Sequence, residues 1–247
     1  MRGAAGALGE RTVRILALDS ATENCSVALL IGRRLIAREQ LLEHGHAEHI
    51  LPMADELLRE ADVSLGALSA IAFGRGPGSF TGVRLAASVA QGLAFGAGLP
   101  VVPISDLRAL AQRVMELDAA VTRVLVCNDA RMHEVYWGCF ERPAGGAVAA
   151  AAQDEQVGKP AAVSLPASWS AAPRAVHAAG SGFAVYPELR LGLAGQLERV
   201  HEALLPRAAE IARLAVPEVA CGRVLPAEQA LPVYLRDDVA HATGGSH

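Results

Sequence analysis

A turn of small polar residues follows the first apolar run of the chain and has the composition of a phosphate-binding turn. Asp19, Ser20 and Thr22 lie in it, directly after the run at residues 13–18. A glycine in such a turn lets backbone N–H groups approach a phosphate closely. Ala21 stands in that place here, and its methyl group obstructs the approach. We interpret the segment as a vestigial phosphate turn whose side chains bond the local backbone, with an ATP site as the alternative.

A glycine-rich segment, residues 74–84, is the most distinctive stretch of the sequence and reads GRGPGSFTGVR. It lies between a predicted strand and a predicted helix, where phosphate loops occur. No Lys-Ser/Thr pair closes it as in a Walker loop, and its glycine spacing differs from the dinucleotide fingerprint. Ser79 or Thr81 is expected to cap the following helix. Tight turning of the backbone and close approach of another chain both remain open as reasons for the glycines.

Side chains for hydrolysis or metal binding do not form a recognisable set. His46 and His49 are three residues apart near a helix start, without the spacing or the carboxylate that a metal site needs. No G-x-S-x-G elbow is present. Asp129 and Glu134 flank a turn and could pair with Arg131, which favours a salt-bridge network over acid–base catalysis. We therefore predict no catalytic residue, no metal and no cofactor, and the role of these three residues stays open.

The charge and cysteine content exclude several classes of protein. The 247 residues carry a formal net charge of -4, and Lys159 is the single lysine, so strong autonomous RNA binding is not expected. The four cysteines form no C-x-x-C pair and are expected to be separate reduced thiols of a cytoplasmic protein. No apolar run has the length of a membrane helix.

The pattern of apolar residues predicts two α/β units of similar build. A strand, a hairpin, a helix at residues 46–60, a strand, a helix at about 80–96, a strand and another helix form the first series. A second hairpin near residues 124–140 opens a degraded repeat of it. Both early helices carry apolar or small residues on more than one face, which is typical of a helix that is buried or shared with a partner.

Several of these stretches resemble the bacterial TsaB family, also called YeaZ. The opening run ILALDSATENCSVAL at residues 15–29 and ILPM at 50–53 carry the resemblance, as do FGRGPGSFTGVR at 73–84 and AQGLA at 90–94. DARM at 129–132, EVYW at 134–137 and PVYLR at 232–236 extend it. The likeness covers about residues 13–240 and is patchy between 143 and 225.

The resemblance implies a fold and a function. The fold is the two-lobed α/β architecture of actin and hexokinase (ASKHA, ribonuclease H-like). The implied function is that of a non-catalytic scaffold subunit in adding threonylcarbamoyl to the adenosine beside the anticodon of tRNAs that read codons starting with A. The implied partners are a TsaD-like catalytic subunit and a TsaE-like ATPase, and tRNA would be met only through the complex. An ATP-dependent kinase or carbamoyltransferase of the same fold is the alternative, and a metallopeptidase is a third.

The resemblance also implies where the partner binds and how the chain is divided. The pairing surface of the family is built from two helices, which correspond here to residues 46–61 and 80–96, and the same patch could pair two copies of this chain. The expected contact residues are His46, Ile50, Met53, Leu57, Arg75, Val83, Arg84, Ala87, Ala90 and Gln91. We expect a first lobe at residues 13–106, a second at 107–239, and flexible termini at 1–12 and 240–247.

Overall fold

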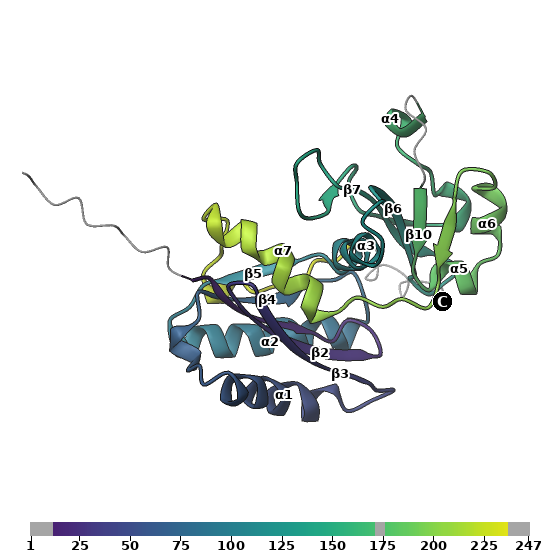
Figure 1. The fold of residues 1–247 in the computed structure, drawn as a ribbon. Helices are drawn as coiled ribbons and strands as arrows, with labels where there is room; N and C mark the ends of the chain where they lie inside the picture. Colours follow the sequence, from purple (N-terminus) through teal and green to yellow (C-terminus); the bar gives the residue numbers. More distant parts are fainter. Residues whose placement is uncertain (1–11, 171–175, 237–247) are drawn as a thin grey trace, which may run out of the picture.

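The computed structural model describes residues 12–170 and 176–236. The termini that the sequence predicts to be flexible lie outside the described residues, apart from Thr12. Two sheets make up the body of the molecule, one in each lobe (Figure 1). No helix in the described part of the chain is both long enough and apolar enough to cross a membrane.

The first sheet has the strand order β3-β2-β1-β4-β5. Its strands are β1 (Arg14–Asp19), β2 (Asn24–Ile31), β3 (Arg34–Leu41), β4 (Ala70–Gly74) and β5 (Val101–Ile104). The first three form an antiparallel meander, while β1, β4 and β5 run parallel to one another. The carboxyl ends of β1, β4 and β5 therefore meet at one edge of the sheet, which is where the phosphate turn and the glycine-rich segment begin.

Helices cover both faces of this sheet, which explains why β1 reads as a continuous apolar run. Helices α1 (His46–Glu60) and α2 (Phe80–Ala97) pack on one face, against Leu16 and Leu18. Helix α7 (Ala208–Ala220) packs on the other face, against Ile15 and Ala17 (Figure 1). Alternate residues of one strand thus enter two different cores.

The second sheet has the order β11-β10-β6-β7-β8, with β9 also paired to β7. Its strands are β6 (Arg123–Asp129), β7 (Val135–Glu141), β8 (Ala150–Ala151), β9 (Gln156–Gly158), β10 (Val176–Ala179) and β11 (Arg199–His201). Helix α3 (Asp106–Leu117) packs on one face. The short elements η2 (Pro160–Ala162), α4 (Ala167–Ser170), α5 (Gly182–Val185) and α6 (Glu188–Gly192) lie in the same lobe. The two hairpins, β1–β2 and β6–β7, occupy matching places, as the repeated pattern predicts.

The division into lobes differs from the one expected at residue 106. Helix α7 belongs to the core of the first lobe, although the sequence places it after the second sheet. The Ser26 hydroxyl on β2 accepts a hydrogen bond from the Ala208 N–H at 3.0 Å, which fixes the start of α7 on the first sheet. The short helix η3 (Ala227–Gln229) then packs against α2. Residues 107–239 are therefore not one lobe, because the chain crosses back to cover the open face of the first sheet.

Candidate functional site: a closed phosphate turn and an open helix face

The polar groups of the turn after β1 form hydrogen bonds with the backbone of the turn itself. The Asp19 carboxylate accepts a hydrogen bond from Ala21 N–H at 2.9 Å, and the Thr22 hydroxyl accepts one from Asn24 N–H at 3.2 Å. Asp19, Ser20 and Ala21 are at most 1% exposed. A phosphate could reach this turn only if the structure around it opened.

The glycine-rich segment lies directly on that turn. The Ser79 N–H donates to the Ala21 carbonyl at 2.8 Å, and the Ser20 hydroxyl donates to the Gly82 carbonyl at 2.8 Å. A Cβ at Gly78 would lie 2.6 Å from the Ala21 carbonyl oxygen, and one at Gly82 would overlap the carbonyl oxygen of Ser20. The close approach that these glycines permit is therefore between two segments of this chain. Ser79, one of the two expected caps, caps α2.

Two fully buried carboxyl groups meet behind the turn. Asp106, the first residue of α3, accepts a hydrogen bond from Gly76 N–H at 2.5 Å through Oδ2. Its Oδ1 atom and Oδ2 of Asp19 have no hydrogen-bond partner among the described residues. Burial, and then the neighbouring Asp19 carboxylate, raise the pKa of Asp106 well above its ordinary value. Burial also raises the pKa of Asp19. The two raised pKa values favour the neutral form of a carboxyl in this buried pair.

Sequence reasoning missed the role of Asp106. The residue before it, Ser105, caps α3, because its hydroxyl accepts the Arg108 N–H at 3.1 Å. A usable signal was present: Asp19 ends β1, and Asp106 follows β5 closely. Since β1 and β5 flank β4 in a parallel arrangement, acidic residues at their carboxyl ends come together.

The turn of the second lobe, between β6 and β7, is also held internally. Arg131, Met132 and the next residue all have left-handed backbone angles, with φ of 62° and 55° for the first two. The Asp129 carboxylate accepts hydrogen bonds from the Arg131 N–H at 2.9 Å and from the Tyr186 hydroxyl at 2.7 Å. Glu134 forms its ion pair with Arg236, not with Arg131 as expected. These contacts support a network that shapes the turn.

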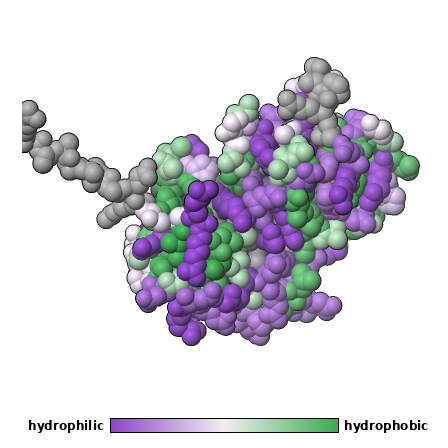
Figure 2. All heavy atoms as spheres, in the orientation of Figure 1, coloured by the Kyte–Doolittle hydropathy of each residue, from purple (hydrophilic) through white to green (hydrophobic). Residues whose placement is uncertain are grey.

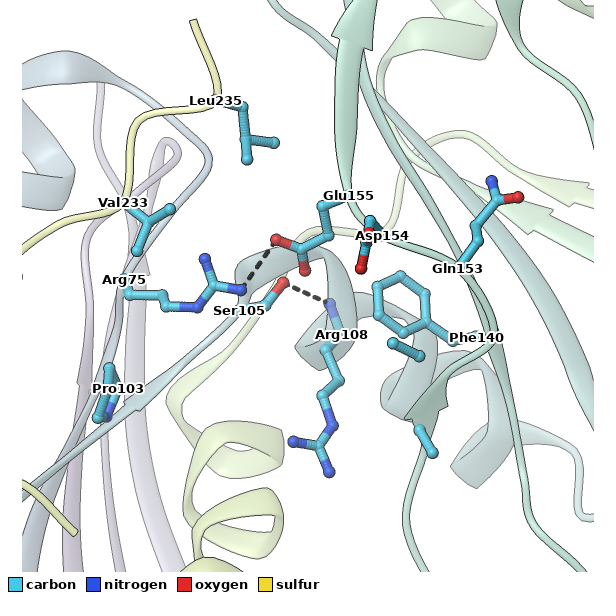
Figure 3. A pocket seen from close by; sticks show the side chains of 12 residues that line it. Arg75, Pro103, Ser105, Arg108, Phe140, Gln153, Asp154, Glu155, Val233 and Leu235 are labelled. Atoms are coloured by element: carbon cyan, nitrogen blue, oxygen red, sulfur yellow. Dashed lines mark hydrogen bonds and ion pairs between the residues drawn. The ribbon is translucent and has the colours of Figure 1, made fainter. Parts of the chain in front are cut away.

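A cleft of about 460 Å³ separates the lobes near these turns (Figure 3). Arg75 from the first lobe points across it to Glu155 of the second and forms an ion pair at 2.9 Å. Arg108, which also lines the cleft, pairs with Glu218 at 3.3 Å. Both cationic residues of the cleft lining are therefore neutralised by carboxylates. In the described residues, no group of three or more His, Cys, Asp or Glu side chains is placed to hold a metal ion, and all four cysteines are free thiols.

Nine of the ten expected partner contacts need correction, because the chain itself uses those side chains, whereas Arg84 stays partly exposed. Six of the ten are buried in the interior of the first lobe, each at most 9% exposed: Ile50, Met53, Leu57, Val83, Ala87 and Ala90. Their burial follows from the apolar stripes that seat α1 and α2 on the sheet. They cannot supply contact surface to another molecule while the lobe stays folded.

Of the other four expected contacts, three hold segments of the chain together, and the fourth, Arg84, lies partly exposed at the surface. His46 lies with Nε2 at 2.9 Å from the Thr22 carbonyl and so ties α1 to the phosphate turn. Gln91 donates to the carbonyls of Ala227 and Glu228, each at 3.3 Å. Arg75 bridges the lobes, as described above, and Arg84 stacks on aromatic rings near the start of α2.

The exposed sides of α1 and α2 differ in polarity. The outward side of α2 is apolar or small, and we call it the α2 face: Leu85, Ser88, Val89, Gly92, Phe95 and Gly96. Phe95 is 69% exposed, and Arg84 is the single charged residue of the helix. The outward side of α1 carries charges instead, with Leu51 as its exposed large apolar residue. Hydrophilic residues accordingly make up most of the lower left edge of Figure 2, where Figure 1 places α1.

A pair of glycine substitutions tests the packing of the loop on the turn. Gly82→Ala places a methyl group against the Ser20 carbonyl, so the two segments must separate, and we expect a loss of about 3 kcal/mol in unfolding free energy. Gly92→Ala, in open space within the same helix, is expected to gain about 1 kcal/mol because alanine is the better helix former. Urea unfolding measures both, and equal effects would contradict the packed arrangement.

Replacing Asp106 by asparagine tests the raised pKa of this residue. Because the folded pKa of Asp106 is raised, the folded chain keeps a proton that the unfolded chain loses above about pH 4. The stability that this proton contributes is complete below the unfolded pKa and is lost as the pH rises through the folded pKa. Asp106→Asn removes this loss, and its amide can donate to Asp19. We expect the difference in unfolding free energy between Asp106→Asn and the wild type to rise in favour of the variant. The rise should be up to about 1.4 kcal/mol for each pH unit above pH 4.

The control for this experiment is Asp62→Asn. Asp62 is exposed and has a left-handed backbone angle that asparagine tolerates well. Its stability should follow the wild type across the same pH range in urea titrations. A constant difference between Asp106→Asn and the wild type at every pH would count against the raised pKa of Asp106.

The chain is similar in sequence to known proteins over most of its length. A family model for TsaD, tRNA N6-adenosine threonylcarbamoyltransferase, matches residues 40–241. The tRNA threonylcarbamoyladenosine biosynthesis protein TsaB of Escherichia coli is 40% identical over 233 residues, which are 92% of this chain and 96% of that protein. The TsaB protein of Haemophilus influenzae is 52% identical over 127 residues, about half of each chain.

Two solved structures are also similar to this chain over most of its length. The structure of YeaZ from Pseudomonas aeruginosa aligns with a TM-score of 0.82 and 44% identity, covering 90% of this chain and all of that one. A second Pseudomonas aeruginosa structure, described as an uncharacterized protein similar to peptidase YeaZ, aligns with a TM-score of 0.83 and 45% identity over 91% of this chain and all of that one. With its two lobes and these relatives over nearly its full length, the chain belongs to the TsaB (YeaZ) family.

Proposed function

We propose that this chain serves in tRNA threonylcarbamoyladenosine biosynthesis as a non-catalytic subunit that binds a homologous TsaD-like transferase. The observation that carries the proposal is the contrast between a phosphate turn closed from within and a helix face left open. The names of the relatives supply the pathway. The match to the TsaD family model supports a homologous chain of that family as the partner.

The absence of a chemical role is inferred from the groups that a phosphoryl or acyl transfer would need. A nucleotide site needs backbone N–H groups and cations that are free to meet phosphates. The Ala21 N–H is already bonded to Asp19, and Arg75 in the adjoining cleft is already paired with Glu155. Binding ATP would therefore require several of these contacts to break.

The pairing role is inferred from the α2 face. Apolar surface removed from water contributes about 25 cal/mol per Å², and a stable pair of proteins buries on the order of 1,600 Å² in total. Much of that gain is offset by the entropy lost on association. Small residues such as Ser88 and Gly92 let a partner helix approach closely. The charged outward side of α1 then suits the polar rim of the interface.

The remaining parts of the proposal concern the assembled complex. A net charge of -4 with a single lysine argues that tRNA is met through the complex and not by the isolated chain. We place the complex in the cytoplasm and include a TsaE-like ATPase in it. In isolation, the α2 face would also allow two copies of the chain to pair.

Glutamate substitutions on α2 test the pairing role. Ser88→Glu puts a bulky charge on the open face, so we expect loss of co-purification with the TsaD-like partner and an unchanged melting temperature. Ala90→Glu, two residues along the helix, buries the charge in the core and should unfold the chain. Ser168→Glu, the same substitution at an exposed position of α4 in the second lobe, is the matched control and should leave both properties unchanged. Co-expression followed by size-exclusion chromatography gives the binding result.

Two results would count against the proposal. A folded Ser88→Glu variant that still elutes with the partner at normal yield would remove α2 from the interface. Micromolar binding of Mg-ATP by the isolated wild-type chain, measured by calorimetry, would favour the alternative of an ATP-dependent enzyme of the same fold.

A further inference from the structure

The C-terminal strap, residues 227–236, runs along one flank of α2 in the opposite direction. Ala227 lies beside Gln91 in the middle of the helix, through the hydrogen bond at 3.3 Å. Tyr234 lies beside Phe80 at the start of the helix, with 6.3 Å between the ring centroids. The Val233 N–H donates to the Arg75 carbonyl at 2.8 Å, which fixes the strap to the glycine-rich segment. The strap therefore borders the α2 face over most of its length.

Arg84 is held between two exposed aromatic rings at this border. Its guanidinium carbon lies 3.1 Å from the centroid of the Phe80 ring and 4.9 Å from that of Tyr234. Phe80 is 68% exposed and Tyr234 is 46% exposed. Among the described residues, Arg84 has no ion-pair partner, and its side chain donates only to the Phe80 carbonyl at 3.3 Å. The stack thus presents a pre-oriented cation that has no carboxylate partner among the described residues.

The surroundings of the stack are apolar. Leu231 of the strap is 63% exposed, and Phe80 and Tyr234 add two further apolar surfaces beside the α2 face. Tyrosine and arginine set within apolar surface are the residues that most often dominate the binding energy of protein interfaces. An oriented arginine also loses less side-chain entropy when it pairs.

We propose that the Phe80–Arg84–Tyr234 stack, with Leu231, is an anchor of the interface and receives a carboxylate on an apolar segment of the TsaD-like partner. This inference rests on the proposed function and adds the strap to the two helices. A second copy that pairs α2 against α2 is less suited to the stack, since α2 carries no acidic residue to pair with Arg84. A nucleic acid is less suited as well, because phosphate recognition needs several clustered cations and α2 offers one.

The test is the affinity of the full-length chain for the purified TsaD-like partner, measured by calorimetry at low and high salt. Arg84→Ala and Tyr234→Ala are each expected to weaken binding more than tenfold. Arg84→Lys keeps the charge but loses the planar stacking, so it should recover only part of the affinity. The wild-type affinity should fall with added salt, and Arg84→Ala should lose most of that dependence.

Two exposed residues away from the strap serve as matched controls. Arg33→Ala, in the β2–β3 turn, removes an exposed cation, and Leu191→Ala removes a side chain that is 77% exposed in the second lobe. Both should bind like the wild type. Melting temperatures of all variants should stay near that of the wild type, because the substituted side chains lie at the surface.

Each contrary result has a separate meaning. If the wild type binds the partner and the stack variants bind equally well, the anchor is overturned and the proposed function stands. If the wild type does not bind the partner at all, the proposed function fails and the anchor fails with it. If the variants assemble normally but the complex loses affinity for tRNA, the stack is a nucleic-acid contact, which also overturns this inference.

Discussion

The close packing of the glycine-rich segment on the turn after β1 is the contact on which the rest of the structure depends. Gly78 and Gly82 allow the two backbones to touch, and the hydrogen bond from Ser79 N–H to Ala21 joins them at 2.8 Å. Behind them, the buried carboxyl of Asp19 at the end of β1 lies close to that of Asp106 at the start of α3, the helix that covers the second sheet. One buried joint thus connects the phosphate turn, the start of α2 and the crossing to the other lobe.

This buried joint also determines two features of the first lobe, the closed turn after β1 and the exposed side of α2. By occupying the turn from inside, it removes the place where a phosphate would bind. By fixing the start of α2, it holds that helix with its apolar stripe on the sheet and its opposite side in solvent. The closed turn and the exposed α2 face therefore have one structural cause, and a change in the loop would alter both.

The C-terminal strap gives the open face its second structural support. It lies against the flank of α2 through Gln91 and Tyr234, and its last described residue, Arg236, pairs with Glu134 on the turn of the second lobe. The strap thus connects the proposed interface to the second lobe. Two motifs that are far apart in the sequence, at residues 129–137 and 232–236, have their physical explanation in this contact.

The sequence by itself determined the elements and the family. The apolar run of β1, the helix at His46–Glu60 and the glycine-rich segment all follow from local spacing, which depends on neighbouring residues alone. Only the tertiary structure decided which sides of α1 and α2 face the core, so Ala87 and Ala90 were expected at an interface and are buried. It also decided that α7 returns to the first sheet and that Asp106 meets Asp19. The physical reason is that burial and pairing across long sequence separations depend on which surfaces remain uncovered after the sheets form, and local patterns carry no record of that.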